Sequence, residues 1–253
     1  MDLGLTDRVF VLTGASRGLG RATAEVLVAE GARVVVSARH QESLDEVVEA
    51  LGGPDRAAAV VADLSDPTAA QRLVTTAQDR YGRLDGALVS VGGPPQGGVL
   101  DTTDEDWSRS FDSIFLGAVR MARTVAAAVG QGGSLALVLS GSVKQPLDNL
   151  AISNGLRPGL GMVVKTLADE VGPRGIRVNA LMPGWVDTER VRELHGSKED
   201  PEAARRTTEA GIPLRRLGRA DEFARAAAFV LSPAASYITG AMLPVDGGAQ
   251  RSL

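Results

Sequence analysis

The chain lacks cysteine and contains few histidines and few aromatic residues. With no cysteine among its 253 residues, disulfides, thiolate nucleophiles, iron–sulfur clusters and cysteine-bound zinc are all excluded. Two histidines, His40 and His195, are too few for a histidine-rich metal site, so we expect no bound metal. Aromatic residues account for only 4% of the chain and hydrophobic residues for 44%, which predicts a core of small aliphatic side chains.

Charge and hydropathy exclude two further classes of protein. The net charge of −4 argues against a nucleic-acid-binding surface. The longest uncharged stretch, residues 124–143, contains the turn sequence Gly130-Gln131-Gly132-Gly133-Ser134 and is therefore not expected to span a membrane. Residues 1–8 carry Asp2 and Asp7 and lack the apolar core of an export signal. We therefore expect a cytoplasmic protein with neither a membrane nor a nucleic acid as its partner.

Short apolar runs alternate with longer segments of helical periodicity along the whole chain. Continuous apolar runs are typical of strands covered on both faces. Regular strand–helix alternation predicts an α/β fold, a single doubly wound parallel-sheet Rossmann domain over residues 1–253, with right-handed crossovers. The predicted strands are 9–12, 34–36, 58–61, 87–89, 135–139, 176–181 and 241–245. The predicted helices are 19–30, 42–51, 68–81, 105–129, 156–171 and 222–231.

One segment interrupts this alternation. Residues 187–214 lack strand character and contain Gly196, Pro201 and Pro213. Because ligands of doubly wound sheets bind at the carboxyl ends of the strands, we predict that this insertion is a lid over that edge. Five arginines lie in or near it: Arg205, Arg206, Arg215, Arg216 and Arg219. We expect a solvated face paired with nearby acids, the alternative being a dock for an acidic carrier or a carboxylate substrate.

A glycine-rich turn follows the first predicted strand. It has the sequence Thr13-Gly14-Ala15-Ser16-Arg17-Gly18-Leu19-Gly20. Gly14 permits a tight turn, Gly18 lets backbone N–H groups approach a pyrophosphate, and Gly20 lets the following helix pack on the strand. The turn therefore predicts a dinucleotide site. Its cofactor-binding residues are Gly14, Ser16, Arg17, Gly18, Leu19 and Gly20.

The same turn also fits a second motif. Gly14-Ala15-Ser16-Arg17-Gly18 satisfies the G-x-S-x-G nucleophile elbow of hydrolases. A hydrolase needs a downstream acid and histidine, and only His40 and His195 are available. Its elbow usually follows several strands, whereas this turn follows the first. We therefore favour the dinucleotide site over a hydrolase and over a glycine turn without a ligand.

The residues after the second predicted strand indicate which dinucleotide is bound. An NAD site places an acid there to accept a hydrogen bond from the ribose 2′-hydroxyl. Here the strand ends in Ser37-Ala38-Arg39. Arg39 and Arg17 are two guanidinium groups suited to a 2′-phosphate, so NADP(H) is predicted over NAD(H). The alternative is that Arg39 is a solvated charge at a helix entry.

These motifs resemble those of the short-chain dehydrogenase/reductase family, in its subgroup of carbonyl reductases such as 3-oxoacyl-(acyl-carrier-protein) reductases. The resemblance covers nearly the whole chain. Residues 13–20 resemble the family's TGxxxGxG, and residues 237–240 and 245–248 resemble its C-terminal strand. It implies NADP, a small-molecule or acyl-type carbonyl substrate, and a homo-oligomer, either a dimer or a tetramer. It also implies further cofactor-binding residues: Asp63 and Leu64 at adenine, Gly92 after the fourth strand, Pro183 and Gly184 over the nicotinamide, and Thr188 on its carboxamide.

The chain departs from the family in its catalytic residues. The family uses Asn, Ser and a Tyr-x-x-x-Lys pair, but Tyr81 and Tyr237 are followed four residues on by Asp85 and Ala241. Counting back from residues 173–175 places Ser153 at the tyrosine and Arg157 at the lysine. Counting forward from Trp107 places Ile114 at the asparagine. The serine remains as Ser142 or, from its spacing to Ser153, as Ser140.

The altered residues still suggest a working site. We expect Ser142 to polarise the substrate oxygen, Ser153 to help position a water that relays the proton, and Arg157 to hold the nicotinamide ribose. These three are the candidate catalytic residues, and Arg157 is also a cofactor-binding candidate. Lys144 and His195 are possible substitutes, although a solvated loop charge and a lid-surface residue are the simpler interpretations.

Local sequence also predicts an altered helix beside this site. Gly155 and Pro158 flank Arg157, and Pro158 cannot donate a helical hydrogen bond. We therefore expect the helix to begin late or to be kinked here.

Three functional hypotheses follow. The first is an NADP(H)-dependent oxidoreductase that transfers hydride between nicotinamide and a carbonyl/alcohol substrate at an atypical site. The second is a cofactor-binding pseudoenzyme, a sensor or non-catalytic subunit, suggested by the missing residue types. The third keeps the fold without a nucleotide.

Overall fold

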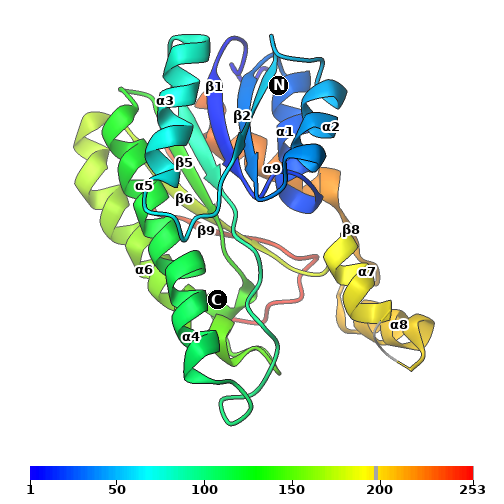
Figure 1. The fold of residues 1–253 in the computed structure, drawn as a ribbon. Coiled ribbons are helices and arrows are strands. Elements are labelled where there is room, and N and C mark those ends of the chain that lie inside the picture. The colour runs from blue at the N-terminus through cyan, green and yellow to red at the C-terminus, as the bar shows by residue number, and fades with distance from the viewer. Residues whose placement is uncertain (197–198, 253) are drawn as a thin grey trace.

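A seven-stranded sheet forms the centre of the computed structural model, which describes residues 1–196 and 199–252 (Figure 1). Its strands pair in the order β3-β2-β1-β4-β5-β6-β9, and every pair is parallel. The strands are β1 (Val9–Thr13), β2 (Arg33–Ala38), β3 (Ala57–Val61), β4 (Gly86–Val89), β5 (Ser134–Val138), β6 (Arg177–Pro183) and β9 (Met242–Val245). The predicted α/β, doubly wound parallel sheet is therefore confirmed. Residues 197, 198 and 253, which the predicted domain and lid ranges include, lie outside the described residues.

Helices cover both faces of the sheet (Figure 1). One layer consists of α1 (Gly18–Ala29), α2 (Gln41–Ala50) and α9 (Ala220–Leu231). The other consists of α3 (Ala69–Tyr81), α5 (Gly117–Ala128) and α6 (Ala151–Val171). Along β1, Val9 and Val11 pack into the α3–α5–α6 layer, whereas Phe10 and Leu12 pack into the other. At the centre of the sheet both faces of the strands are thus buried, which explains the continuous apolar runs in the sequence. The edge strands β3 and β9 are only partly buried.

The long helical segment predicted over 105–129 contains a feature that periodicity did not show. It consists of α4 (Asp104–Ser110), a π-helical segment at Phe111–Leu116 and then α5. Thr103 and Asp106 form a capping box at its start. Ile114, at the position of the family's asparagine, is buried within the π-helical segment.

The expected late start of the helix around Arg157 was wrong, because α6 begins at Ala151 with Pro158 inside it. The alternative, a kink at this point, stays a prediction. The Asn154 side chain fastens the first turn by accepting from the Leu147 N–H (2.9 Å) and donating to the Leu147 carbonyl (2.8 Å). Gly155 leaves room for Trp107, whose ring would lie 2.7 Å from a Cβ at that position.

Residues 187–214 are more regular than predicted. Asp187 belongs to β7 (Val186–Asp187), which pairs with β8 (Gly218–Arg219), so the prediction that the segment lacks strands was wrong at its first residue. Between these strands lie α7 (Glu189–Gly196) and α8 (Pro201–Gly211), which extend away from the sheet (Figure 1). No described residue of either helix is buried, which explains why an apolar periodicity did not reveal them.

Four of the five arginines of this segment are paired with acids, as predicted for a solvated face. Arg205 contacts Glu209 (3.0 Å) and Arg206 contacts Glu202 (3.6 Å) along α8. Arg215 donates to the carbonyl of Ala210. Arg216 and Arg219 join the network described next, so among the described residues only Arg215 of this run keeps a charge without a carboxylate partner.

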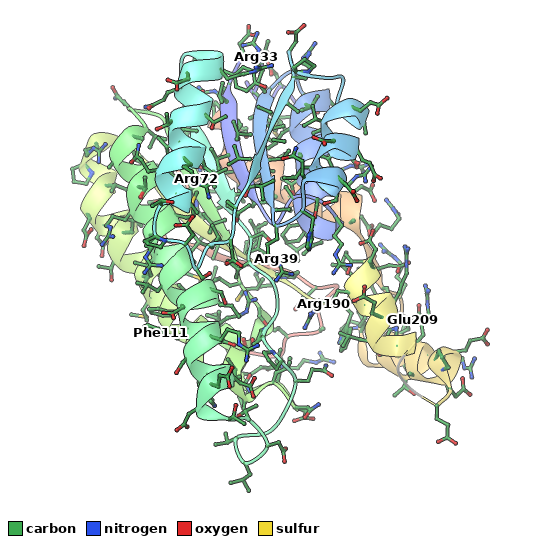
Figure 2. All side chains as sticks on the ribbon, in the orientation of Figure 1. Arg33, Arg39, Arg72, Phe111, Arg190 and Glu209 are labelled. Atoms are coloured by element: carbon green, nitrogen blue, oxygen red, sulfur yellow. The ribbon has the colours of Figure 1, made fainter. Side chains whose placement is uncertain are left out.

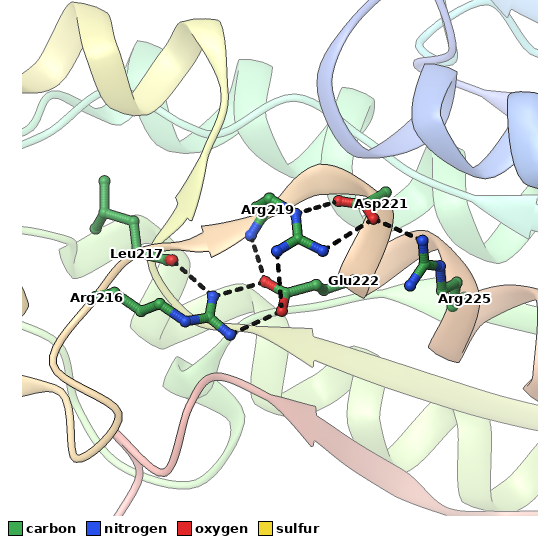
Figure 3. Close-up of polar contacts among 6 residues, drawn as sticks. All are labelled: Arg216, Leu217, Arg219, Asp221, Glu222 and Arg225. Atoms are coloured by element: carbon green, nitrogen blue, oxygen red, sulfur yellow. Dashed lines mark hydrogen bonds and ion pairs between the residues drawn. The ribbon is translucent and has the colours of Figure 1, made fainter.

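A network of ion pairs connects β8 to the first turn of α9 (Figure 3). Arg216 donates through both terminal nitrogens to Glu222, each at 2.7 Å, and the Arg219 N–H donates to the same carboxylate at 2.8 Å. Asp221 accepts from Arg219 at 2.9 Å and pairs with Arg225 at 3.0 Å. The hydrogen bond from Arg216, followed by that from the Arg219 backbone, lowers the pKa of Glu222 to about 2. The base of the segment is thereby fixed to the body of the protein.

We predict that Glu222→Gln removes stability in a pH-dependent way. The pKa of Glu222 in the folded protein lies below its usual 4.5. The stabilisation from its ionised carboxylate is therefore fully present above pH 4.5 and is lost as the pH falls toward 2. The melting temperature of the variant should lie about 1–4 °C below that of the wild type at pH 7, and the gap should close with acidification. Glu105→Gln, which removes an exposed pair with Arg109, is the control. A gap that stays constant down to pH 3 would contradict this prediction.

Candidate functional site

A cleft opens where the strand order reverses, between the carboxyl ends of β1 and β4. In a doubly wound sheet this switch point is where ligands bind, because crossovers leave it in opposite directions. The cleft has a volume of about 760 Å³, within the range of ligand sites. Its lining includes residues that sequence analysis had assigned to a dinucleotide: Gly14, Ser16, Arg17, Arg39, Asp63, Leu64 and Gly92.

Two side-chain contacts brace this switch point. Thr13 Oγ1 donates to the Ser90 carbonyl (2.7 Å) and accepts from the Ser90 N–H (2.9 Å), which joins the ends of β1 and β4. Gly14 follows at a φ of +61°, and a Cβ there would lie 2.9 Å from the Ser90 carbonyl oxygen. The turn therefore needs glycine at this position, both for its conformation and for the close approach of β4.

The remaining glycines fit the shape that a pyrophosphate requires. A Cβ on Gly20 would lie 2.4 Å from the Gly14 carbonyl oxygen, so glycine is needed for the turn to pack on α1. Arg17 precedes α1 without a side-chain cap, and no acid occupies the first helical turn. The N–H groups at this terminus are thus open to an anion. Across from the turn, the Thr188 side chain lies 3.6 Å from the Cβ position of Gly18.

The adenosine end of the cleft is lined by residues that follow β2 and β3. Asp63 accepts from the Ser65 N–H (2.9 Å) and hydroxyl (2.8 Å), and these bonds, with a smaller contribution from the charge of Arg39, lower its pKa. Arg39 is exposed at the end of β2. Arg17 is also exposed and pairs with Glu193 of α7 at 3.0 Å. Both predicted phosphate ligands therefore face the same cleft, and one of them contacts the lid.

The structure brings Ser142 and Ser153 together. Their Oγ atoms are 3.0 Å apart, and both residues are 4% exposed. Ser140 has a different role, because its side chain accepts from the Ser142 N–H at 3.2 Å and caps the turn at Gly141–Val143. Gln250 supports the same turn by donating to the Gly141 carbonyl (2.8 Å). The geometry thus favours Ser142 over Ser140 as the serine of the site.

Arg157 lies beside this serine pair and is buried. Its Nη1 donates to the carbonyls of Val138 and Leu139, each at 3.0 Å, at the carboxyl end of β5. Burial, and secondarily the charge of Arg190, lowers the pKa of Arg157 to about 10, so its guanidinium is charged at neutral pH. One of its nitrogens is therefore bonded to the backbone rather than turned toward a ligand.

Sequence reasoning missed Arg190. It lies at the start of α7, and Figure 2 shows its side chain, like that of Arg39, in the space between the lid and the sheet. A Cβ on Gly93 would lie 2.5 Å from Arg190 Nη2, so the guanidinium contacts the backbone at Gly93. The available signal was its place two residues after Thr188, in the segment that the family resemblance put over the nicotinamide.

The structure also places the two alternative catalytic candidates, His195 and Lys144, and the residues at the end of β6. The His195 ring stacks on Trp185 (5.7 Å between centroids) and shares a hydrogen bond with Thr208 at 3.1 Å, which places it within the lid. Lys144 is exposed. Pro183 ends β6, and Gly184 packs so closely on Asp246 that a Cβ would lie 2.6 Å from the Asp246 Cβ.

Two other kinds of site were searched for within residues 1–196 and 199–252. No group of three or more His, Asp or Glu side chains there could hold a metal ion. In the same ranges, no helix is both long and apolar enough to cross a membrane.

Comparisons with known proteins agree with this geometry. A family model described as enoyl-(acyl carrier protein) reductase matches residues 14–250. The 3-oxoacyl-(acyl-carrier-protein) reductase FabG of Salmonella typhimurium is 31% identical over 243 residues, which cover 95% of this chain and 96% of that protein. A short-chain dehydrogenase/reductase of Brucella melitensis, described as glucose/ribitol dehydrogenase, has a TM-score of 0.92 at 30% identity, with 100% of each chain covered.

A further solved structure resembles the chain over nearly its whole length. It is a short chain oxidoreductase from Pseudomonas aeruginosa PAO1, described as containing an atypical catalytic center. It is 29% identical, with a TM-score of 0.91 over 99% of this chain and 100% of that one. The fold, the family match and these relatives together show that the chain belongs to the short-chain dehydrogenase/reductase family and is an oxidoreductase of that type.

We predict that alanine destabilises the fold at one glycine of the glycine turn and is tolerated at a glycine of the cleft. Gly20→Ala should destabilise the fold by about 2 kcal/mol, because its Cβ meets the Gly14 backbone, which cannot move aside. Gly92→Ala is the matched control, since nothing lies within 4 Å of its Cβ position, and its stability should stay within about 0.5 kcal/mol. Urea unfolding monitored by circular dichroism measures both. Equal stability of the two variants would contradict the packing described here.

Proposed function

We propose that this protein is an NADP(H)-dependent oxidoreductase that transfers hydride between nicotinamide and a carbonyl/alcohol substrate at an atypical catalytic site. The observation that carries the proposal is the cleft at the strand switch point. Its lining combines an uncapped helix terminus and a glycine turn with two arginines at the adenosine end. The helix terminus and the glycine turn suit a pyrophosphate, and the two arginines suit a 2′-phosphate.

Each part of the cofactor would be held by a different stretch of the chain. The turn at residues 14–20 would hold the pyrophosphate through backbone N–H groups, with Ser16 and Leu19 beside it. Arg17 and Arg39 would hold the 2′-phosphate, and Asp63 and Leu64 the adenine. The remaining contacts are assigned to Gly92, Pro183, Gly184, Thr188 and Arg157.

The serine pair would handle the substrate oxygen. When bound, the nicotinamide supplies or accepts the hydride. Ser142 would donate a hydrogen bond to the substrate oxygen, and Ser153 would hold the Ser142 hydroxyl in place at 3.0 Å. Because a serine hydroxyl is far less acidic than a phenol, the proton would reach the oxygen through a water held by the two hydroxyls. Loss of a direct general acid costs about 10²–10⁴-fold in rate, so we expect slow turnover.

Arg157 would supply the positive charge of the missing lysine. Its Nη1 is bonded to Val138 and Leu139, so contact with the nicotinamide ribose would use its other nitrogens. The two backbone bonds would hold the guanidinium more rigidly than a lysine side chain. The Pseudomonas aeruginosa relative with an atypical catalytic center supports a divergent site in this family.

A cofactor-binding pseudoenzyme, acting as a sensor or a non-catalytic subunit, is the second candidate. It is favoured by one observation: Ile114, Ser153 and Arg157 stand where the family's asparagine, tyrosine and lysine are expected, and Ile114 is buried without a polar group. The two candidates share the cofactor and differ in turnover.

We also propose a homo-oligomer. Met162 on α6 is 66% exposed and Phe111, at the start of the π-helical segment, is 43% exposed. Large apolar side chains exposed on neighbouring helices are typical of subunit contacts. Light scattering of the purified protein should give a mass of two or four chains, and a monomer would contradict this proposal.

Arg39→Ala tests the cofactor assignment. We expect it to weaken NADPH binding by about 10- to 100-fold and to leave NADH binding unchanged, because only NADPH carries the 2′-phosphate. Fluorescence titration with each dinucleotide measures this. Arg56→Ala, an exposed arginine outside the cleft, is the control. If the wild type binds neither dinucleotide, the proposed function is wrong.

Turnover separates the two candidates. Consumption of NADPH with a panel of carbonyl compounds should be measurable for the wild type. Ser142→Ala should reduce it by at least about 10²-fold, because the substrate oxygen loses its donor. NADPH binding without any turnover would instead identify the pseudoenzyme.

A further inference from the structure

Two guanidinium groups lie past the carboxyl ends of β4 and β5, close enough for the charge of Arg190 to act on Arg157. Arg157 comes from α6 and is bonded to the end of β5. Arg190 comes from α7, which follows β6 and β7, and contacts Gly93 after the end of β4. They thus lie at the carboxyl ends of β4 and β5, and Arg157 shares α6 with Ser153 of the serine pair. This is where the proposed hydride transfer takes place, and the dinucleotide turn lies on the neighbouring strand, β1.

The backbone is shaped to admit the Arg190 side chain. The Cβ position of Gly93 is 2.5 Å from Arg190 Nη2 and 2.7 Å from its Cζ. Any side chain at residue 93 would displace the guanidinium from the cleft. Next to it, nothing lies within 4 Å of the Cβ position of Gly92, so the space beside the contact is open.

Neither guanidinium has a carboxylate partner among residues 1–196 and 199–252. Neighbouring charges of the lid are paired: Arg192 contacts Asp187 at 2.8 Å, and Glu193 contacts Arg17 at 3.0 Å. Asp187 and Glu193 thus serve other arginines, and the adjacent Glu189 faces the glycine turn, its Oε2 lying 3.8 Å from the Cβ position of Gly18. Burial first, and the charge of Arg190 second, lowers the pKa of Arg157, as expected for two like charges without an anion between them.

The strand order argues for substrate over cofactor as the source of this anion. The pyrophosphate is assigned to the N-terminus of α1, directly after β1, where backbone N–H groups are open. Arg190 lies against Gly93, after β4, and Arg157 lies at the end of β5, the strand that precedes the Ser142 turn. A planar guanidinium matches a carboxylate through two parallel hydrogen bonds.

We propose that Arg190, assisted by the charge of Arg157, binds a carboxylate of the substrate, which makes this a site for oxo acids or the corresponding hydroxy acids. The assignment rests on the proposed function and names its substrate class. It places the anion site on a residue of the predicted lid.

The experiment compares an oxo acid with its uncharged ester. Calorimetric titration of the protein–NADP⁺ complex with benzoylformate and with methyl benzoylformate measures binding without reduction, because the cofactor is already oxidised. Oxamate and acetoacetate extend the acid series. We expect the wild type to prefer benzoylformate to its ester by about 10- to 100-fold.

Three variants locate the anion. Arg190→Ala should abolish the preference for the acid and leave the affinity for NADP⁺ unchanged. Gly93→Ala should also lose the preference, because it displaces the same guanidinium. Arg192→Ala, a lid arginine paired with Asp187, is the matched control and should keep it.

Several outcomes would overturn the assignment. Equal binding of acid and ester, or no binding of any of the acids, would exclude the anion site. A parallel loss of NADP⁺ affinity in Arg190→Ala would assign the guanidinium to the pyrophosphate. If NADP⁺ does not bind but benzoylformate binds to the protein alone and requires Arg190, the proposed function fails while the anion site stands.

Discussion

The reversal of strand order between β1 and β4 is the constraint on which the rest of this structure depends. Right-handed crossovers carry the chain in one direction to β2 and β3 and in the other to β5 and β6, so the carboxyl ends part at the switch point. The reciprocal hydrogen bonds between Thr13 and Ser90 hold the two edges of the opening at a defined separation. The glycine turn, the Ser142 turn and the lid all lie on this one edge of the sheet.

The half of this edge that the proposed function assigns to catalysis has the fold of the family but not the residues expected at its catalytic positions. A buried arginine stands in place of a lysine and is held by two carbonyls at the end of β5. A serine pair joined at 3.0 Å stands where a serine and a tyrosine are expected. Gln250, from the end of the chain, holds the turn that carries Ser142. The site therefore has fixed hydroxyls and a fixed positive charge, but no acidic phenol.

In the predicted lid, the role that an arginine can play depends on whether it forms an ion pair with an acid. Arg205, Arg206 and Arg216 are close to one another in the sequence, yet each is neutralised by a glutamate. Arg190 looks unremarkable in the sequence, but it reaches the cleft because Gly93 leaves room for it. The number of arginines in this segment suggests a binding surface on α8, whereas the geometry suggests one at Arg190, which contacts the cleft.

The sequence by itself determined the order of strands and helices, the doubly wound class and the glycine turn. These features follow from local periodicity and from the conformational needs of single residues such as Gly14. Tertiary structure alone decided that α6 begins at Ala151, that Ser142 rather than Ser140 meets Ser153, and that Arg190 enters the cleft. These three features depend on contacts between residues far apart in the chain or on side chains that share a turn. Such contacts leave no periodic pattern in the sequence. Sequence periodicity also did not predict α7 and α8, because exposed helices bury no apolar stripe.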